Sequence, residues 1–110
     1  MDLKLRNKTA LVTGASKGLG FETAKMLSAE GALVAINGRD EEKLQASAKE
    51  ISHQTNQCVL PISGDVTDPE TPHKLIDKTI QSFHSLDILI TNSGGPAAGK
   101  FEDFGDEQWQ

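Results

Sequence analysis

Residues 9–20 read TALVTGASKGLG, and this stretch decides the fold. Its first part, Thr9–Thr13, is a short run of apolar and β-forming residues, which predicts a strand. After Gly20 the apolar positions change to helical spacing, with Ala24 and Leu27 on one face. A strand therefore leads through a glycine turn into a helix. This geometry points backbone N–H groups and the positive end of the helix at one place, which suits a pyrophosphate.

The three glycines of the turn have separate expected roles. Gly14 permits the tight turn, Gly18 lets the backbone approach the phosphates, and Gly20 allows close packing of the helix on the strand. Their spacing, G-x-x-x-G-x-G, differs from the G-x-G-x-x-G of the dehydrogenase fingerprint. Because no Gly-Lys-Ser/Thr follows, a P-loop NTPase is disfavoured. A lone glycine cluster also fits an ordinary strand-to-helix turn, so the later segments have to decide.

Beyond the turn, apolar runs alternate with amphipathic stretches. We expect strands at about 8–13, 32–37, 57–62 and 86–91, and helices at about 18–30, 40–54 and 68–84. Strands that alternate with helices imply right-handed crossovers and a parallel sheet covered on both faces. The predicted fold is therefore a Rossmann-like, doubly wound α/β domain of three layers (α/β/α), with the strand order 3-2-1-4.

The helix starts and buried faces can also be predicted. Asp40 is the expected N-cap of the second helix. The third helix is expected to begin at Asp68-Pro69, with the proline at its first helical position. The buried faces are predicted to consist of Leu44, Ala48 and Ile51 in the second helix, and of Leu75, Ile76, Thr79, Ile80 and Phe83 in the third.

Several segments, in this order, resemble the short-chain dehydrogenase/reductase family. Thr13–Gly20 resembles the family's glycine motif, and Gly64–Asp68 resembles its adenine-contacting Asp-Val segment. Leu86–Gly95 resembles the fourth strand and the Asn-Asn-Ala-Gly motif that follows it, although Thr91 and Ser93 replace the usual Asn and Ala. The resemblance covers essentially the whole chain, which corresponds to the first half of a family member.

The resemblance implies that residues 1–110 are an NADP(H)-binding Rossmann-like domain, the N-terminal part of a longer one. Asp65 would accept a hydrogen bond from the adenine amino group, the Val66 N–H would donate to the ring, and Gly94 would pass close to the ribose. Asp65 and Asn92 also fit plain turn residues that follow a strand. The implied cofactor-binding residues are Gly14, Ser16, Lys17, Gly18, Leu19, Gly20, Arg39, Asp65, Val66, Asn92 and Gly94.

The end of the second strand bears on the choice between NAD and NADP. An NAD enzyme of this architecture usually has an acidic residue there, about 20 residues past the glycine turn, to bind the ribose 2′-OH. Here Asn37 holds that place, with Arg39 two residues on. A guanidinium can bind a 2′-phosphate through two charge-assisted hydrogen bonds, and Lys17 adds a second cation. Each charge alone would fit a solvated surface residue, but together they favour NADP(H).

The family's catalytic residues do not occur in this chain. The resemblance implies hydride transfer between NADP(H) and a carbonyl or alcohol, with a tyrosine of a Tyr-x-x-x-Lys motif moving the proton, yet the chain has no tyrosine. We therefore assign no catalytic residue and expect the chain alone to be inactive. The parent protein is most similar to 3-oxoacyl-[acyl-carrier-protein] reductases. A sugar or polyol dehydrogenase of the same family, or a non-catalytic nucleotide-binding fragment, remains an alternative.

Composition sets further limits. The 110 residues carry a net charge of −5 and 36% hydrophobic residues, which fits one soluble domain without a basic patch for nucleic acid. No apolar stretch suggests a leader or a membrane span, so we expect a cytoplasmic protein. The family resemblance implies a homo-oligomer, either a dimer or a tetramer. We expect residues 86–91 to form an unpaired sheet edge, so that the chain self-associates or is a piece of a longer polypeptide.

The remaining reactive side chains give no site. Cys58 is the single cysteine, which excludes a disulfide within the chain, and we interpret it as a small hydrophobe that starts a strand. His53, His73 and His84 share no metal-ligand spacing, so we expect solvated histidines and no metal. Trp109 is assigned a structural role.

Overall fold

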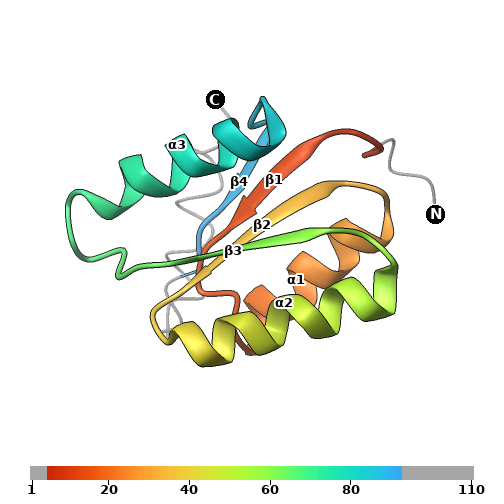
Figure 1. The fold of residues 1–110 in the computed structure, drawn as a ribbon, viewed down its shortest axis with the longest axis horizontal. Coiled ribbons are helices and arrows are strands. Elements are labelled where there is room, and N and C mark those ends of the chain that lie inside the picture. Colours follow the sequence, from red (N-terminus) through yellow and green to blue (C-terminus); the bar gives the residue numbers. More distant parts are fainter. Residues whose placement is uncertain (1–4, 93–110) are drawn as a thin grey trace.

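The computed structural model describes residues 5–92, in which a four-stranded parallel sheet lies between two layers of helices (Figure 1). The strands run in the order β3-β2-β1-β4 and comprise β1 (Thr9–Val12), β2 (Leu33–Gly38), β3 (Val59–Ser63) and β4 (Ile88–Ile90). The helices are α1 (Gly18–Ala29), α2 (Glu41–Thr55) and α3 (Thr71–Phe83). In Figure 1, α1 and α2 lie below the sheet and α3 lies above it. The predicted fold class and strand order are confirmed.

The inner strands are buried on both faces. On β1, Ala10 and Val12 belong to the core between the sheet and helices α1 and α2, whereas Leu11 belongs to the core between the sheet and α3. β2 repeats the pattern, with Ile36 in the first core and Ala35 in the second. Side chains alternate between the two faces of a strand, so a continuous apolar run can supply both cores.

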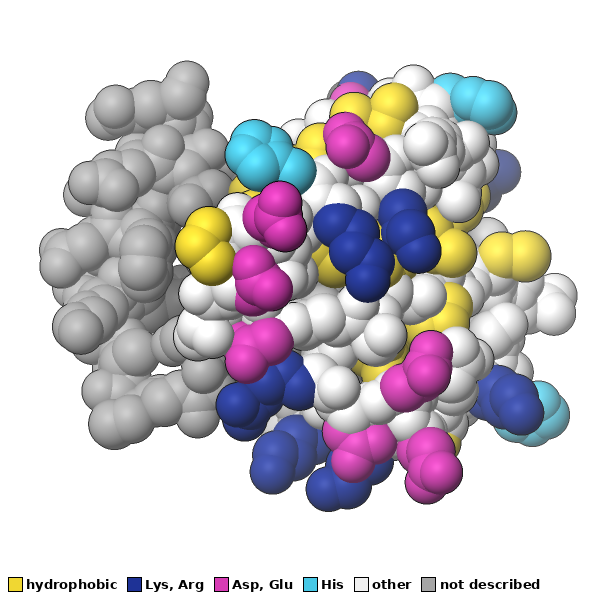
Figure 2. Space-filling view, turned by 60° about the vertical axis from the view of Figure 1, so that its left-hand side comes forward, with side chains coloured by type: hydrophobic (Ala, Val, Ile, Leu, Met, Phe, Trp, Pro, Cys, Tyr) yellow, Lys and Arg dark blue, Asp and Glu magenta, His cyan; other side chains and the backbone are white. Residues whose placement is uncertain are grey.

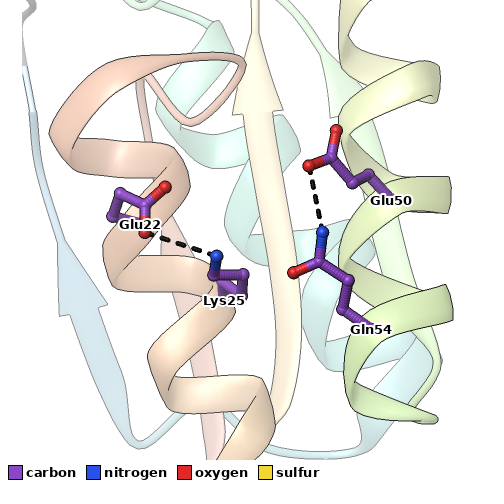
Figure 3. Close-up of polar contacts among 4 residues, drawn as sticks. All are labelled: Glu22, Lys25, Glu50 and Gln54. Atoms are coloured by element: carbon purple, nitrogen blue, oxygen red, sulfur yellow. Dashed lines mark hydrogen bonds and ion pairs between the residues drawn. The ribbon is translucent and has the colours of Figure 1, made fainter.

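The predicted buried faces of α1 and α2 are confirmed. Ala24 and Leu27 of α1, and Leu44, Ala48 and Ile51 of α2, are all buried. Polar side chains also contact one another on the outer surfaces of these helices (Figure 3). Two surface pairs lie within single helices, Lys25 with Glu22 at 3.5 Å and Gln54 with Glu50 at 3.1 Å. Such pairs contribute only about 0.2–0.5 kcal/mol each, so α1 and α2 are held mainly by their buried faces.

The start of α3 differs from the prediction. The helix begins at Thr71, and the proline in its first turn is Pro72. Asp68 instead closes a turn ahead of the helix, where its Oδ1 accepts the Glu70 N–H over 3.0 Å. An Asp-Pro pair fits a turn as well as a helix start, and here the aspartate side chain stabilises a turn that precedes the helix.

The buried face of α3 is narrower than predicted. Leu75 and Thr79 are buried, and Ile76 and Phe83 pack against the core while partly exposed. Ile80, by contrast, is 43% exposed. One residue rotates the helix by about 100°, so Ile80 turns away from the sheet while its neighbour Thr79 faces it.

The reactive side chains lie on the surface. Cys58 is exposed and precedes the first residue of β3, so its prediction as a small hydrophobe starting a strand is wrong. His53, His73 and His84 are exposed, and residues 5–92 hold no group of three or more His, Cys, Asp or Glu side chains that could bind a metal ion. No helix within this part of the chain is long and apolar enough to cross a bilayer.

Charges of both signs are mixed on the surface. In Figure 2, where the left-hand side of Figure 1 is turned forward, basic and acidic side chains intermingle with small hydrophobic areas. Nucleic-acid-binding surfaces concentrate Lys and Arg in one patch or stripe. Among the described residues on the face shown in Figure 2, acidic side chains lie beside each group of basic ones.

Asn37 is a buried polar residue that joins three parts of the fold. Its side chain is almost fully buried, and its Nδ2 donates to the carbonyl oxygens of Ile62 over 3.0 Å and Gly64 over 3.1 Å. Its own carbonyl oxygen accepts the Ala15 N–H over 2.8 Å. The end of β2 is thereby fixed to β3 on one side and to the glycine turn on the other.

This arrangement predicts that Asn37→Asp destabilises the fold by about 3 kcal/mol near neutral pH, because a carboxylate would face two carbonyl oxygens without a proton to donate. Burial would raise the pKa of the new carboxyl group, so the loss should be complete above that pKa and shrink in mild acid, where the protonated group can donate one bond. Urea denaturation at both pH values measures the effect. Asn7→Asp, at an exposed position, is the matched control. Equal stabilities of the two variants would contradict the buried-donor role.

Candidate cofactor site

The predicted site residues follow strands that end at one edge of the sheet. All four strands are parallel, and their carboxyl ends lie toward the left of Figure 1. β1 leads into the glycine turn, β2 into Arg39, β3 into Asp65 and Val66, and β4 into Asn92. This edge includes the point beside β1 where the strand order reverses, and ligands bind at such points in open parallel sheets.

Gly14 and Gly20 are required by close packing. Gly14 has a φ of +59°, and a Cβ atom there would overlap the carbonyl oxygen of Asn92. A Cβ at Gly20 would overlap the carbonyl oxygen of Gly14. The glycine turn is therefore wedged between the end of β4 and the first turn of α1. We expect Gly20 to pack on the strand; the observed contact lies just beyond the strand, on the turn itself.

Gly18 lies on the open side of the turn. It has a φ of +66°, and within residues 5–92 no atom apart from those of its chain neighbours and its own helix backbone lies within 4 Å of the position that a Cβ would take. Its neighbours Lys17 and Leu19 are exposed, Leu19 by 66%. This side of the turn is accessible to a ligand along the backbone.

The N-terminus of α1 is open where that of α2 is capped. Lys17 holds the N-cap position of α1 in an extended conformation, and its side chain makes no capping hydrogen bond. In α2, by contrast, Oδ1 of Asp40 accepts the Lys43 N–H over 3.1 Å, as predicted. The first N–H groups of a helix have no partner within the helix, and they carry its positive dipole end. The start of α1 can therefore receive an anion.

Hydrogen bonds to β4, β2 and α2 hold the glycine turn to its neighbours. They run from Thr13 N to Ile90 O over 2.9 Å, from Ala15 N to Asn37 O over 2.8 Å, and from Ser47 Oγ to Ser16 O over 2.8 Å. The partners belong to β4, β2 and α2. The turn is thus anchored on three sides before any ligand binds.

The residue of β2 that faces the turn is Gly38. Asn37 was assigned from the sequence to the position where an NAD enzyme of this architecture has its acidic residue, and this assignment is wrong by one residue. The Asn37 side chain is directed at β3, as its two hydrogen bonds show. A Cβ at Gly38 would lie 3.3 Å from Cβ of Ser16 and 3.3 Å from Cδ1 of Leu44. A side chain at position 38 would therefore project beside the glycine turn. Arg39, the next residue, is exposed.

Asp65 combines a turn role with a charged, exposed carboxylate. Its Oδ1 accepts the Thr67 hydroxyl over 2.7 Å and the Thr67 N–H over 2.9 Å. These two bonds, in that order, hold the pKa of the Asp65 carboxyl below its usual range against a smaller opposing effect of desolvation, and the Arg39 guanidinium lowers it further. Val66 beside it is 41% exposed. The carboxylate therefore stays ionised and remains exposed at the site edge.

At β4, the backbone of Asn92 completes the site edge. Its N–H donates to Oγ1 of Thr13 over 3.0 Å, and its carbonyl oxygen lies against Gly14. Gly94 and Trp109 lie outside the described residues.

Two residues of this site were not found by sequence reasoning. Ser47 is a polar residue on the otherwise apolar face of α2, and that mismatch is the signal that could have revealed it. Gly38 lies two residues beyond Ile36 and therefore on the same face of β2, the face covered by α1 and α2. Extending the strand by one residue would have identified it.

Comparison with known proteins gives a family match over nearly the whole chain. A family model described as short chain dehydrogenase matches residues 8–110. An uncharacterized oxidoreductase of Bacillus subtilis, YvaG, is 38% identical over 110 residues, which cover 99% of this chain and 40% of that protein. A peroxisomal 2,4-dienoyl-CoA reductase of Danio rerio is 37% identical over 91 residues, covering 83% of this chain and 30% of that protein.

Among solved structures, the L-sorbose reductase of Gluconobacter frateurii, complexed with NADPH and L-sorbose, aligns with a TM-score of 0.82. The two chains are 30% identical, and the alignment covers 86% of this chain and 36% of the reductase. This chain spans less than half the length of the curated relatives it matches.

The packing at Gly20 predicts an effect opposite to helix propensity. Propensity alone would make Gly20→Ala stabilising by about 1 kcal/mol, whereas overlap with the Gly14 carbonyl should make it destabilising by about 3 kcal/mol. Gly18→Ala is the control: its Cβ would meet no other part of the described chain, and it should cost only about 1 kcal/mol for its positive φ. Chemical denaturation of the three proteins measures the difference. A Gly20→Ala variant as stable as the wild type would show that α1 does not depend on this contact.

Proposed function

The chain belongs to the short-chain dehydrogenase family, and from this we propose that it is the NADP(H)-binding part of an oxidoreductase that transfers hydride between NADP(H) and a carbonyl or alcohol substrate. Residues 1–110 would then be the N-terminal part of a longer catalytic domain. The observation that carries the proposal is the uncapped start of α1, placed beside an anchored glycine turn at the carboxyl edge of the sheet.

The residues present fit a dinucleotide. A Cβ at Gly14 or Gly20 would disrupt the turn, while the open side at Gly18 leaves room for a pyrophosphate beside the first N–H groups of α1. Asp65 and Val66 would hold the adenine, and Asn92 with Gly94 would border the ribose. When bound, the nicotinamide would supply or accept the hydride.

The preference for NADP(H) rests on the end of β2. Gly38 places no carboxylate beside the turn, so nothing at that position would repel a 2′-phosphate. Lys17 and Arg39 are both exposed and follow directly in the chain on Ser16 and Gly38, the two residues in contact, so both cations could pair with the phosphate. The NADPH bound by the structurally similar L-sorbose reductase supports the same choice.

For the substrate, we propose a 3-oxoacyl thioester of the acyl-carrier type, as the sequence resemblance implies. The similarity to L-sorbose reductase favours a sugar or polyol as the second candidate. We also propose a cytoplasmic homo-oligomer, a dimer or tetramer, on the family resemblance. A nucleotide-binding module without turnover is the remaining candidate, since the chain contains no tyrosine.

Cofactor titration tests the proposal directly. The full-length protein encoded by the gene should bind NADPH more tightly than NADH, and Arg39→Ala should weaken NADPH binding roughly tenfold to hundredfold, because a bidentate charged contact is lost. NADH binding should change little. Arg6→Ala, which removes an exposed arginine ahead of the opposite end of β1, is the control. Equal affinities of the wild type for the two cofactors would contradict the preference.

Gly38 supplies a second arm of the same test. Gly38→Asp should lower the affinity for NADPH and favour NADH, because a carboxylate beside Ser16 would repel the 2′-phosphate and could accept the ribose 2′-OH. Gly38→Asn has the same size without the charge, so it separates repulsion from crowding against Leu44. If both variants lost NADPH equally, crowding alone would explain the effect.

The isolated 110-residue chain should show no NADPH-dependent carbonyl reduction, because it has no tyrosine to act as the family's proton donor. Assays with 3-oxoacyl thioesters and ketoses would measure this, with the full-length protein as the positive control. Turnover by the purified 110-residue chain, shown by intact mass to be free of longer protein, would refute the expectation.

A further inference from the structure

Ser47 makes an unusual hydrogen bond for a helix residue. It lies on the buried face of α2 and is 7% exposed, and its hydroxyl donates to the carbonyl oxygen of Ser16 over 2.8 Å. Two other helix hydroxyls, of Thr55 and Thr79, bond the carbonyl four residues back in their own helices. That local bond is the common choice for a Ser or Thr within a helix. Ser47 instead reaches the glycine turn, 31 residues away in the chain.

The bond fixes the direction of a peptide unit at the candidate site. The Ser16–Lys17 peptide is planar and trans, so its C=O and N–H point in opposite directions. Because the carbonyl is held by α2, the Lys17 N–H is directed away from α2. The preceding Ala15 is fixed separately, since its N–H donates to Asn37 O over 2.8 Å. Lys17 therefore leaves the turn from an anchored peptide, even though its side chain is exposed.

The same bond relates the two proposed phosphate-binding cations to each other. Arg39 lies two residues before the first residue of α2, and Lys17 lies one residue after the carbonyl that α2 holds. Gly38 also approaches Ser16 closely, since a Cβ at position 38 would lie 3.3 Å from Cβ of Ser16. The end of β2, the first half of α2 and the glycine turn are thus connected, and Arg39 and Lys17 both belong to this part of the chain.

We propose that Ser47 is a positioning residue for cofactor selectivity. Through its hydrogen bond to the Ser16 carbonyl, it holds the backbone of Lys17 in a fixed position relative to Arg39, so that the two cations can bind one 2′-phosphate. The inference rests on the proposed NADP(H)-binding function. Ser47 itself does not touch the cofactor. Its loss should therefore affect the 2′-phosphate more than the groups that NADPH and NADH share.

The test compares Ser47→Ala with a closely matched control. Ser28 is also a buried helix serine, and its hydroxyl makes a hydrogen bond of the same length, 2.8 Å, to Thr55 between α1 and α2. Ser28→Ala removes the same atom without touching the glycine turn. Dissociation constants for NADPH and NADH would be measured for the full-length wild type and both variants. Ser47→Ala should reduce the ratio of NADPH to NADH affinity roughly threefold to tenfold, the loss expected for one hydrogen bond, while Ser28→Ala leaves the ratio unchanged.

Hydrogen exchange provides a readout that needs no cofactor. In the free protein, amides of the turn from Ser16 to Leu19 should exchange faster in Ser47→Ala than in Ser28→Ala, because only the first variant releases the peptide. Ser47→Cys keeps a side chain of similar shape with a weaker donor, and it should shift both readouts in the same direction by less. If the alanine variant folds poorly, Ser47→Cys takes its place in both measurements.

The outcomes separate this inference from the proposed function. If the wild type prefers NADPH but Ser47→Ala lowers both affinities by the same factor, the positioning role is overturned and the cofactor proposal stands. If the wild type binds neither cofactor, or binds both equally, the proposed cofactor preference fails and the selectivity role fails with it.

Discussion

The fold around the candidate site depends on two positions where no side chain can be present. Gly14 lies against the carbonyl oxygen of Asn92, and Gly20 lies against the carbonyl oxygen of Gly14. Three backbone segments, the end of β4, the glycine turn and the first turn of α1, are therefore in direct contact. This contact fixes the direction in which α1 leaves the sheet and brings the end of β4 beside the turn.

Hydrogen bonds then divide the polar groups of the turn into two sets. The Thr13 and Ala15 N–H groups and the Ser16 carbonyl are used by β4, β2 and α2. The N–H groups that follow, at the start of α1, receive no side-chain capping hydrogen bond from Lys17. A preformed site of this kind requires little reordering when an anion binds, because the backbone is already fixed. The side chain of Asp40 caps the start of α2, whereas the starts of α1 and α3 have no side-chain cap; of these two, only the start of α1 adjoins the glycine turn.

Much of the fold could be predicted because its signals are local. The alternation of strands and helices, the Asp40 cap and the buried faces of α1 and α2 follow from residue types and their spacing along the chain. The strand order is the one typical of the Rossmann-like fold. The errors arise where two local signals compete or where packing decides. Asp68 can start a helix or close a turn, and only the tertiary context selects the turn. Whether Asn37 or Gly38 faces the glycine turn depends on which face of β2 each residue lies on. The hydrogen-bond partner of Ser47 is distant in sequence and cannot be found from local spacing.

The charges at the sheet edge add a constraint on how a dinucleotide would lie. Although the chain carries a net charge of −5, the described start of α1 and the end of β2 present Lys17 and Arg39. Asp65, at the end of β3, has a lowered pKa and is ionised, so it repels a phosphate from that side while it can accept a hydrogen bond from a base amino group. The cations at the start of α1 and the end of β2 would attract phosphate groups, and the carboxylate at the end of β3 would repel them. These charges would orient the ligand with its phosphates toward β1 and α1 and its base toward β3. The backbone N–H groups at the start of α1 would bind the phosphates, and the charges at the strand ends would set the orientation of the dinucleotide.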